Sequence, residues 1–458
     1  MTDTTTPIDP QVAASDALAL GERIVEAATK AGATEAEAMV GTGHSSLTRF
    51  ANSQIHQNVA EDGAFVNLRF ILGKRVAVAS SGRTDEDGIR SLVERAAAIA
   101  RQIEELEEWG GLPEPSAASP LPTAYAEATA AATPELRAEG AKAVIAAADA
   151  AGAIAFGSFS MDVEAIAVAN SRGVRAAESR TSSQLLTVVT GPDGGSGYAE
   201  ACAVDATTID ASALGREAAE KAGASGNAVS VDPGDYPVVL ESYAVTDILD
   251  MLAYLGFSAL AVQEGRSFVE PGRVVGSKLV TIVDDGRDPA GLPASFDYEG
   301  VAKRHVDLID AGVCRGVVYD RQTAVRDGVA STGHGLPAPN TYGPFPGHML
   351  MSAGSASRDE LIGGLERGLL VTRFHYTNPV HPKKVVVTGM TRDGTFLVEG
   401  GRIVGPVRNL RFTQSYLDAL AGVEAVSAER KVLKGFLGAS VVPAVRIASW
   451  SFTGTTEH

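Results

Sequence analysis

One apolar segment, residues 244–262, most constrains what this chain can fold into. Its sequence is AVTDILDMLAYLGFSALAV, and its apolar side chains recur at helical spacing: Ile248, Met251, Leu252, Leu255 and Ala259. Thr246 is suited to cap the start of a helix, and Gly265 is a stop signal after its end. The pattern predicts one long helix buried in a large core. No histidine lies in this segment.

The composition narrows the possible partners. A chain of 458 residues is long enough for two or three domains, and 45% hydrophobic and 21% charged residues are ordinary values. The formal net charge of -17 argues against nucleic acid as a partner, because phosphate binding requires clustered Lys and Arg. No apolar run has the length of a membrane span, so we expect no membrane partner.

Two features lead us to expect a cytoplasmic protein. The first residues, MTDTTTPIDPQ, contain neither the basic region nor the apolar region of a signal peptide. The two cysteines, Cys202 and Cys314, lie too far apart in the sequence to suggest a disulfide framework. We therefore predict two reduced thiols in a reducing compartment.

The order of the expected elements predicts an α+β fold, with a mixed α/β N-terminal half and a β-rich C-terminal domain. Helices are expected at residues 10–31, 84–105, 133–151, 209–222, 359–367 and 413–420. Strands are expected in the N-terminal half at residues 37–41, 47–59, 63–79, 153–160, 163–170, 174–182, 184–190 and 198–204. In the C-terminal half they are expected at residues 236–240, 279–284, 305–310, 313–319, 385–392, 394–399, 402–404 and 441–452.

Two kinds of local signal divide the chain further. Glu61-Asp62-Gly63 and Gly73-Lys74 predict turns between antiparallel strands. Residues 107–122 and 223–234 are rich in Gly, Pro or Ser and predict linkers. The domains are therefore expected at residues 1–112, 113–230 and 231–458.

Few residues suggest chemistry directly. The chain has no nucleotide-binding, zinc-finger, zincin or hydrolase motif. Most histidines lie in the last third, but their spacing matches no metal-ligand pattern: His305, His334, His348, His375 and His381. Asp284 and Asp285 follow one another on an expected strand, so their side chains should point in opposite directions.

The loop at residues 331–347 is the strongest candidate for a binding segment. It combines glycines, prolines, hydroxyl groups and one imidazole, a composition typical of a substrate-facing loop and equally of purely structural turns. The candidate substrate-binding residues are Ser331, Thr332, Gly333, His334 and Asn340. The residues themselves indicate no catalytic group and no metal ligand.

An ordered set of motifs resembles the TldD/PmbA family of peptidase-related proteins. The set comprises residues 265–268, 281–285, Phe296-Asp297-Tyr298-Glu299-Gly300, 305–319, 321–324, 331–334, 368–372, 399–403 and 406–410. Asn52-Ser53 and the hairpin at residues 63–79 fit the layout of the family's N-terminal half. The resemblance covers most of the chain.

The resemblance implies one of two kinds of subunit. TldD-like members carry a histidine–glutamate–histidine zinc motif on the first helix of the C-terminal domain and a cysteine ligand near the C-terminus. PmbA-like (TldE) members lack the metal and pair with a TldD-like subunit in a heterodimeric protease. Here the corresponding helix offers Leu252, Ala253, Tyr254 and Leu255, and residues 434–439 contain no cysteine. The chain is thus expected to be the subunit without zinc, with zinc in its partner.

Two functions therefore stay open at this point. The first is a non-metal subunit that pairs with a TldD-like metallopeptidase and helps to hold a peptide, for instance by strand addition. The second is a stand-alone amide or peptide hydrolase with an unfamiliar site, for which His334, His375 and His381 are the candidates. A purely structural assembly protein is a weaker third possibility.

Overall fold

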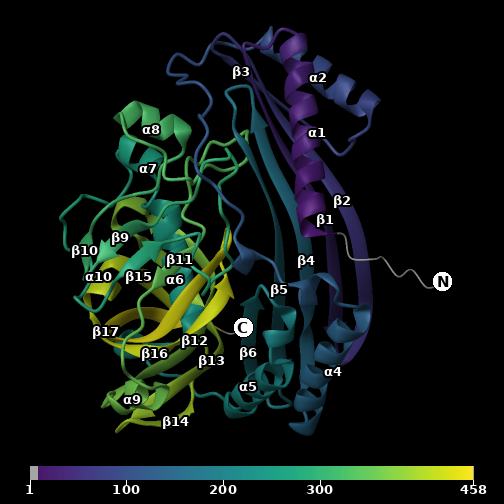
Figure 1. Ribbon diagram of the computed structural model, residues 1–458. Helices are drawn as coiled ribbons and strands as arrows, with labels where there is room; N and C mark the ends of the chain where they lie inside the picture. Colours follow the sequence, from purple (N-terminus) through teal and green to yellow (C-terminus); the bar gives the residue numbers. More distant parts are fainter. Residues whose placement is uncertain (1–8, 457–458) are drawn as a thin grey trace.

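The structure is a computed structural model that describes residues 9–456 and has an α+β fold, as predicted. Figure 1 shows two bodies: long N-terminal strands with helices beside them, and a C-terminal domain built largely from strands. The N-terminal elements are α1 (Pro10–Lys30), β1 (Glu35–Ala51), β2 (Gln54–Leu72), β3 (Arg75–Ser81), α2 (Glu86–Ala100), η1 (Pro122–Ala124), α3 (Glu127–Ala130), α4 (Pro134–Ala150), β4 (Ile154–Asn170), β5 (Arg175–Thr190), β6 (Ser196–Ala203), η2 (Ala206–Thr208) and α5 (Ala211–Ala224).

The C-terminal domain follows after one connecting segment. Its elements are β7 (Gly234–Leu240), α6 (Ser242–Leu255), α7 (Ala259–Gln263), β8 (Ile282–Asp284), β9 (Val306–Asp310), β10 (Val313–Cys314), α8 (Arg321–Asp327), β11 (Met349–Met351), α9 (Arg358–Gly363), β12 (Arg367–His381), η3 (Pro382–Lys384), β13 (Val386–Glu399), β14 (Arg402–Pro406), β15 (Leu410–Ser415), α10 (Tyr416–Ala421), β16 (Val423–Lys434) and β17 (Ala439–Thr455).

The N-terminal strands form a single six-stranded antiparallel sheet in the order β3-β2-β1-β4-β5-β6. Because successive side chains of a strand point to opposite faces, each strand places side chains on both faces of the sheet. On one face, residues such as Val40 and Ala167 pack against α1 and α2, and Phe50 and Phe159 pack against α4 and α5. The other face packs against Phe296 of the C-terminal domain. The sheet thus joins both N-terminal segments and carries the C-terminal domain on its helix-free side.

Several N-terminal strands are longer than predicted. The expected turn at Glu61-Asp62-Gly63 is wrong: β2 continues through these residues, paired with β1. The chain reverses instead at Asn52 and Ser53, whose φ values are 51° and 56°, inside the segment predicted as one strand at residues 47–59. Asp62-Gly63 is a common turn sequence, but here both residues pair with the long strand β1 and stay in the sheet. The turn at Gly73-Lys74 is confirmed.

The C-terminal sheet has eleven strands and partly closes on itself. The strands β17, β15, β13, β12 and β7 are neighbours in that order, and β17 also pairs with β7. These five strands therefore form a ring. Residues of α6 share one hydrophobic core with inward side chains of this ring, including the fully buried Trp450.

The apolar segment at residues 244–262 is buried and helical, but it does not form one continuous helix. The structure has α6 and then α7, separated at Gly256, and a Cβ atom at Gly256 would lie 2.0 Å from the Phe268 ring. Ile248 and Leu252 lie in the core, as predicted. The predicted cap is wrong: the helix begins at Ser242, and Thr246 donates its hydroxyl to the carbonyl of Ser242 within it.

A buried ion-pair network joins the two bodies. Arg69 on β2 contacts Glu37 on β1 at 2.6 Å and Glu299 of the C-terminal domain at 3.2 Å. Glu299 also accepts a hydrogen bond from the backbone of Arg321, at 2.7 Å. All three ion-paired side chains are at most 12% exposed. Within residues 9–456, no helix combines the length and apolar character needed to cross a membrane.

Candidate functional site

A cavity of about 170 Å³ lies beside α6, where the two bodies meet. Its walls come from β6 of the N-terminal sheet and from α6, β12 and β16 of the C-terminal domain. The lining residues are Tyr198, Glu200, Tyr243, Thr246, Asp247, Asp250, Arg373, Phe374, Leu433 and Lys434. Helical spacing brings positions 243, 246, 247 and 250 of α6 to this one side. This side of α6 is therefore mainly polar, whereas Ile248, Leu249 and Leu252 face the core.

The positions that the family resemblance singled out on α6 lie outside this cavity. Leu252, Ala253 and Leu255 are buried in the core, and Tyr254 is 41% exposed and does not line the cavity. A ligand in the cavity would meet Tyr243, Thr246, Asp247 and Asp250 of this helix.

Three carboxylates line the cavity, and they differ in how many hydrogen bonds they accept. Glu200 accepts hydrogen bonds from Tyr198 at 2.6 Å and Gln184 at 2.8 Å. Asp247 accepts one from Thr377 at 2.6 Å and one from Tyr416 at 2.7 Å, through different oxygens. Asp250 accepts one from the backbone of Phe436, at 3.1 Å, through Oδ2 only. Its Oδ1 is thus the least satisfied of the six oxygens.

The electrostatics of the site follow from burial. Burial raises the pKa of Asp250 to about 7, and the neighbouring Asp247 and Glu200 add to this shift. Burial also raises the pKa of Asp247, although its two hydroxyl donors oppose the effect. Burial and the charge of Glu200 raise the pKa of the Tyr198 phenol. Both aspartates therefore keep their protons to a higher pH than exposed aspartates do, and the Tyr198 phenol stays protonated at neutral pH.

These side chains do not suit zinc. Zinc sites in proteins draw mainly on thiolate and imidazole ligands, and α6 presents neither to the cavity. Both oxygens of Asp247 and both of Glu200 already accept hydrogen bonds. Across the described part of the chain, no group of three or more His, Cys, Asp or Glu side chains is arranged to hold a metal ion.

An aromatic cluster around Phe436 connects α6 to the loop at residues 331–347. The Phe436 ring, on the exposed segment after β16, has its centre 6.2 Å from that of Tyr254 on α6. It lies equally far from Phe345, near the end of the loop. Phe436 is 68% exposed. The predicted loop thus contacts the segment after β16 through Phe345, and none of its residues is among those that line the cavity.

The five candidate residues of that loop all form hydrogen bonds with other residues of this chain. Ser331 donates to the carbonyl of Tyr319, and a Cβ atom at Gly333, whose φ is 75°, would lie 2.4 Å from the carbonyl of Ala302. Asn340 donates to the carbonyl of Gly343 at 2.9 Å. These contacts shape the loop, and a role in substrate binding stays a prediction.

His334 takes part in a buried relay of side chains. Its Nε2 lies 2.7 Å from Asp284 Oδ1, and its Nδ1 lies 2.9 Å from Thr332 Oγ1. Burial and the charge of Lys303 lower the pKa of His334, so the ring is neutral. The Thr332 hydroxyl also accepts a hydrogen bond from the backbone of Tyr319, at 2.7 Å. The order Thr–His–Asp matches that of a nucleophilic triad, but the His334 and Asp284 side chains are fully buried.

His348 adjoins this relay, because its backbone N–H donates to Asp284 Oδ2 at 2.8 Å. The remaining histidines of the C-terminal domain lie apart from it. His375 and His381 are on β12, and no hydrogen bond or ion pair links either of them to His334 within residues 9–456. His305 lies at the surface between Asp285 and Asp307, at 3.1 Å from each. Asp284 and Asp285 thus point in opposite directions, as predicted. Sequence reasoning missed the cavity carboxylates, because β6 and α6 lie far apart in the chain.

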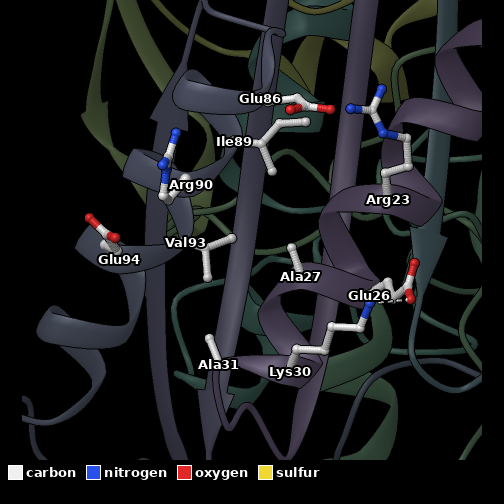
Figure 2. A pocket seen from close by; sticks show the side chains of 10 residues that line it. All are labelled: Arg23, Glu26, Ala27, Lys30, Ala31, Glu86, Ile89, Arg90, Val93 and Glu94. Carbon is white, nitrogen blue, oxygen red and sulfur yellow. Dashed lines mark ion pairs between the residues drawn. The ribbon is translucent and has the colours of Figure 1, made fainter.

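A second hollow lies between α1 and α2 on the outer face of the N-terminal sheet (Figure 2). It encloses about 430 Å³, with Ala27, Ile89 and Val93 facing one another across it. Charged side chains surround it, including the ion pair between Glu26 and Lys30. It contains no histidine, cysteine or hydroxyl group, so we assign it no chemistry.

Family models match three consecutive parts of the chain. The PmbA/TldA metallopeptidase C-terminal domain matches residues 233–454, domain 1 matches residues 36–100, and the central domain matches residues 124–225. The chain belongs to the TldD/PmbA family. The resemblance drawn from the ordered motifs is confirmed.

Two curated relatives of this TldD/PmbA protein carry metalloprotease names. A "Metalloprotease" of Methanothermobacter thermautotrophicus is 27% identical over 239 residues, which are 50% of this chain and 51% of the relative. A "Metalloprotease TldD homolog" of Buchnera aphidicola is 28% identical over 218 residues, covering 44% of this chain and 42% of the relative. The chain matches about half the length of these curated relatives.

Solved structures share the whole fold. TldE from Thermococcus kodakarensis superimposes with a TM-score of 0.88 at 21% identity, covering 95% of this chain and all (100%) of that one. A protein from Thermotoga maritima gives a TM-score of 0.83 at 19% identity, covering 95% and 99%. At such identities the likeness establishes the TldD/PmbA architecture.

Proposed function

We propose that this chain is the non-metal subunit of a TldD/TldE-type metallopeptidase complex that processes peptides or peptide-like substrates. A TldD-like partner supplies zinc and the hydrolytic chemistry, and this chain contributes part of the peptide-binding surface. The complex is cytoplasmic, in keeping with two free, buried cysteines.

One observation carries the proposal. The side of α6 that faces the cavity presents a phenol, a hydroxyl and two carboxylates in place of imidazole and thiolate ligands. Zinc-dependent hydrolysis needs three protein ligands, an open position for water and a base. The likeness to TldE over the whole fold supports the same assignment.

Co-expression tests the proposal. We expect a tagged copy of this chain to co-purify with a TldD-like protein of the same organism and to contain no stoichiometric zinc when purified alone. Metal analysis and a generic peptidase assay then compare three samples: this chain, the partner and the complex. Zinc and peptidase activity should follow the partner, and activity should be highest in the complex.

A stand-alone hydrolase is the second candidate, favoured only by the Thr332–His334–Asp284 relay. It predicts that the isolated chain cleaves a peptide and that His334→Gln abolishes the cleavage. Cleavage by the isolated chain that a partner does not increase would overturn the proposed function. A zinc-free, inactive chain that gains activity only with its partner would exclude the alternative.

A further inference from the structure

We propose that Arg137 of α4 and Asn58 of β2 bind a small oxyanion, either a carboxylate or inorganic phosphate, on the helix-covered face of the N-terminal sheet. This site is separate from the cavity beside α6, and the inference does not depend on the proposed function. Arg137 is the one arginine among the described residues that is buried, with 2% of its surface exposed. Its guanidinium makes a single hydrogen bond there, from Nη2 to Asn58 Oδ1 at 3.2 Å.

Arginines that are less deeply buried in this protein pair with carboxylates, as Arg69 does with Glu37 and Arg373 does with Asp393. Within residues 9–456, Arg137 has no such partner, and its Nε atom is buried without any hydrogen bond. Burying an unpaired charge is costly, and a guanidinium keeps its proton at any ordinary pH, so it does not become neutral instead. An anion from outside the chain would supply the missing negative charge.

The surroundings of the guanidinium favour an anion further. Asn58 Oδ1 also accepts a hydrogen bond from the Thr48 hydroxyl at 3.3 Å, so the amide nitrogen of Asn58 is left as another donor. Asn58 is exposed, which places the guanidinium close beneath the surface. Burial lowers the pKa of Arg137, and the charge of the exposed Glu135 offsets this shift only in part. The first turn of α4, to which Arg137 is adjacent, adds positive partial charge.

The shape of the guanidinium selects the kind of anion. Its planar fork of N–H groups matches two oxygens of one carboxylate or phosphate, whereas a chloride ion meets it at one point. A water molecule could accept a hydrogen bond from Nε, but it would leave the buried charge unpaired. Because only 2% of Arg137 is exposed, we expect a small ion and not part of a larger molecule.

Thermal unfolding of the full-length chain tests the site with two probes, sodium acetate and sodium phosphate. Each replaces sodium chloride stepwise at neutral pH, and the ionic strength is held constant. We expect at least one probe to raise the unfolding temperature along a saturating curve, by about 1–3 °C when its concentration is about tenfold above its dissociation constant. The probe that saturates at the lower concentration shows whether the site prefers a carboxylate or a phosphate.

Three variants separate this site from a general effect of salt. Arg137→Met should lose the saturating rise, and in chloride alone it should unfold at the wild-type temperature or above, because it has no charge to bury. Arg137→Lys keeps the charge but loses the fork, so we expect it to bind the probe about tenfold more weakly or worse. The control is Arg216→Met on the exposed side of α5, which should keep the wild-type response.

Two results would overturn the inference. If neither probe gives a saturating rise in the wild type, water alone hydrates the guanidinium. If Arg137→Met keeps the wild-type response, the rise is a general effect of the salt on the protein. Should Arg137→Met fail to fold, Arg137→Lys decides in the same way: an unaltered affinity for the probe contradicts the site. Complex formation with a TldD-like partner is measured separately, so either idea can fail while the other stands.

Discussion

At the scale of single residues, Asp250 links burial to a dependence on pH. Burial raises its pKa to about 7, while an aspartate in an unfolded chain has a pKa of about 3.9. Between these two values the folded chain keeps a proton that the unfolded chain has lost. The contribution of Asp250 to stability is therefore complete below about pH 4 and is lost as the pH rises towards 7.

The Asp250→Asn variant should reveal this linkage. At pH 8 we expect it to be more stable than the wild type by about 1–3 kcal/mol, because an amide carries no charge to bury. The difference should disappear near pH 4. Urea unfolding at both pH values measures it, with Asp149→Asn on the exposed side of α4 as the control. A variant that is less stable than the wild type at pH 8 would contradict this account.

Sequence reasoning reached some of these residues and not others. It predicted the opposite directions of Asp284 and Asp285, because strand geometry alone decides them. It also singled out His334 but not its burial, which depends on how the loop at residues 331–347 folds onto β8. The convergence of Glu200 and Asp250 was out of reach, since only the packing of β6 against α6 brings them to one cavity.

At the scale of elements, the break between α6 and α7 depends on the absence of a side chain at Gly256. A Cβ atom there would lie 2.0 Å from the Phe268 ring, which is fully buried and packs against Phe257. We expect Gly256→Ala to destabilise the protein by about 1–3 kcal/mol, because neither ring can move without disturbing the core. Chemical denaturation measures the loss.

The matched control for this substitution is Gly223→Ala. Gly223 lies in α5, and a Cβ atom there would meet nothing within 4 Å. Alanine favours the helix, so this variant should be as stable as the wild type or up to about 1 kcal/mol more stable. If both variants lose the same stability, the steric explanation for the break is wrong.

Elements with strong periodicity were predicted well, and long strands were not. The helices α1, α2, α4 and α5 are confirmed close to their expected bounds, because their apolar stripes and caps are local features. The strands β4 and β5 were each predicted as two pieces, since polar residues interrupt them. Pairing with equally long neighbours keeps such residues in a strand, and that pairing is not a local property.

At the scale of the whole molecule, Arg69 joins the N-terminal sheet to the C-terminal domain. Removing its charge leaves Glu37 and Glu299 buried without a cation. We expect Arg69→Met to cost about 3–5 kcal/mol, the range for breaking one side of a buried ion pair. Thermal unfolding followed at more than one wavelength measures the loss and shows whether the two bodies then unfold separately.

Arg90→Met is the control for this prediction. Arg90 pairs with Asp87 on α2, but both side chains are at least 63% exposed. An exposed pair contributes little to stability, so the control should unfold like the wild type. A similar loss in both variants would mean that the effect comes from the substitution and not from the link between the bodies.

The ring in the C-terminal domain has a consequence for the order in which the protein can fold during synthesis. The strand β17 pairs with β7, β11, β15 and β16, although β7 leaves the ribosome about two hundred residues earlier. Until β17 emerges, these strands have unpaired edges, and unpaired edges invite association with other chains. The six-stranded N-terminal sheet has no such requirement. The N-terminal half can therefore assemble first and offer its helix-free face to a C-terminal domain that closes last.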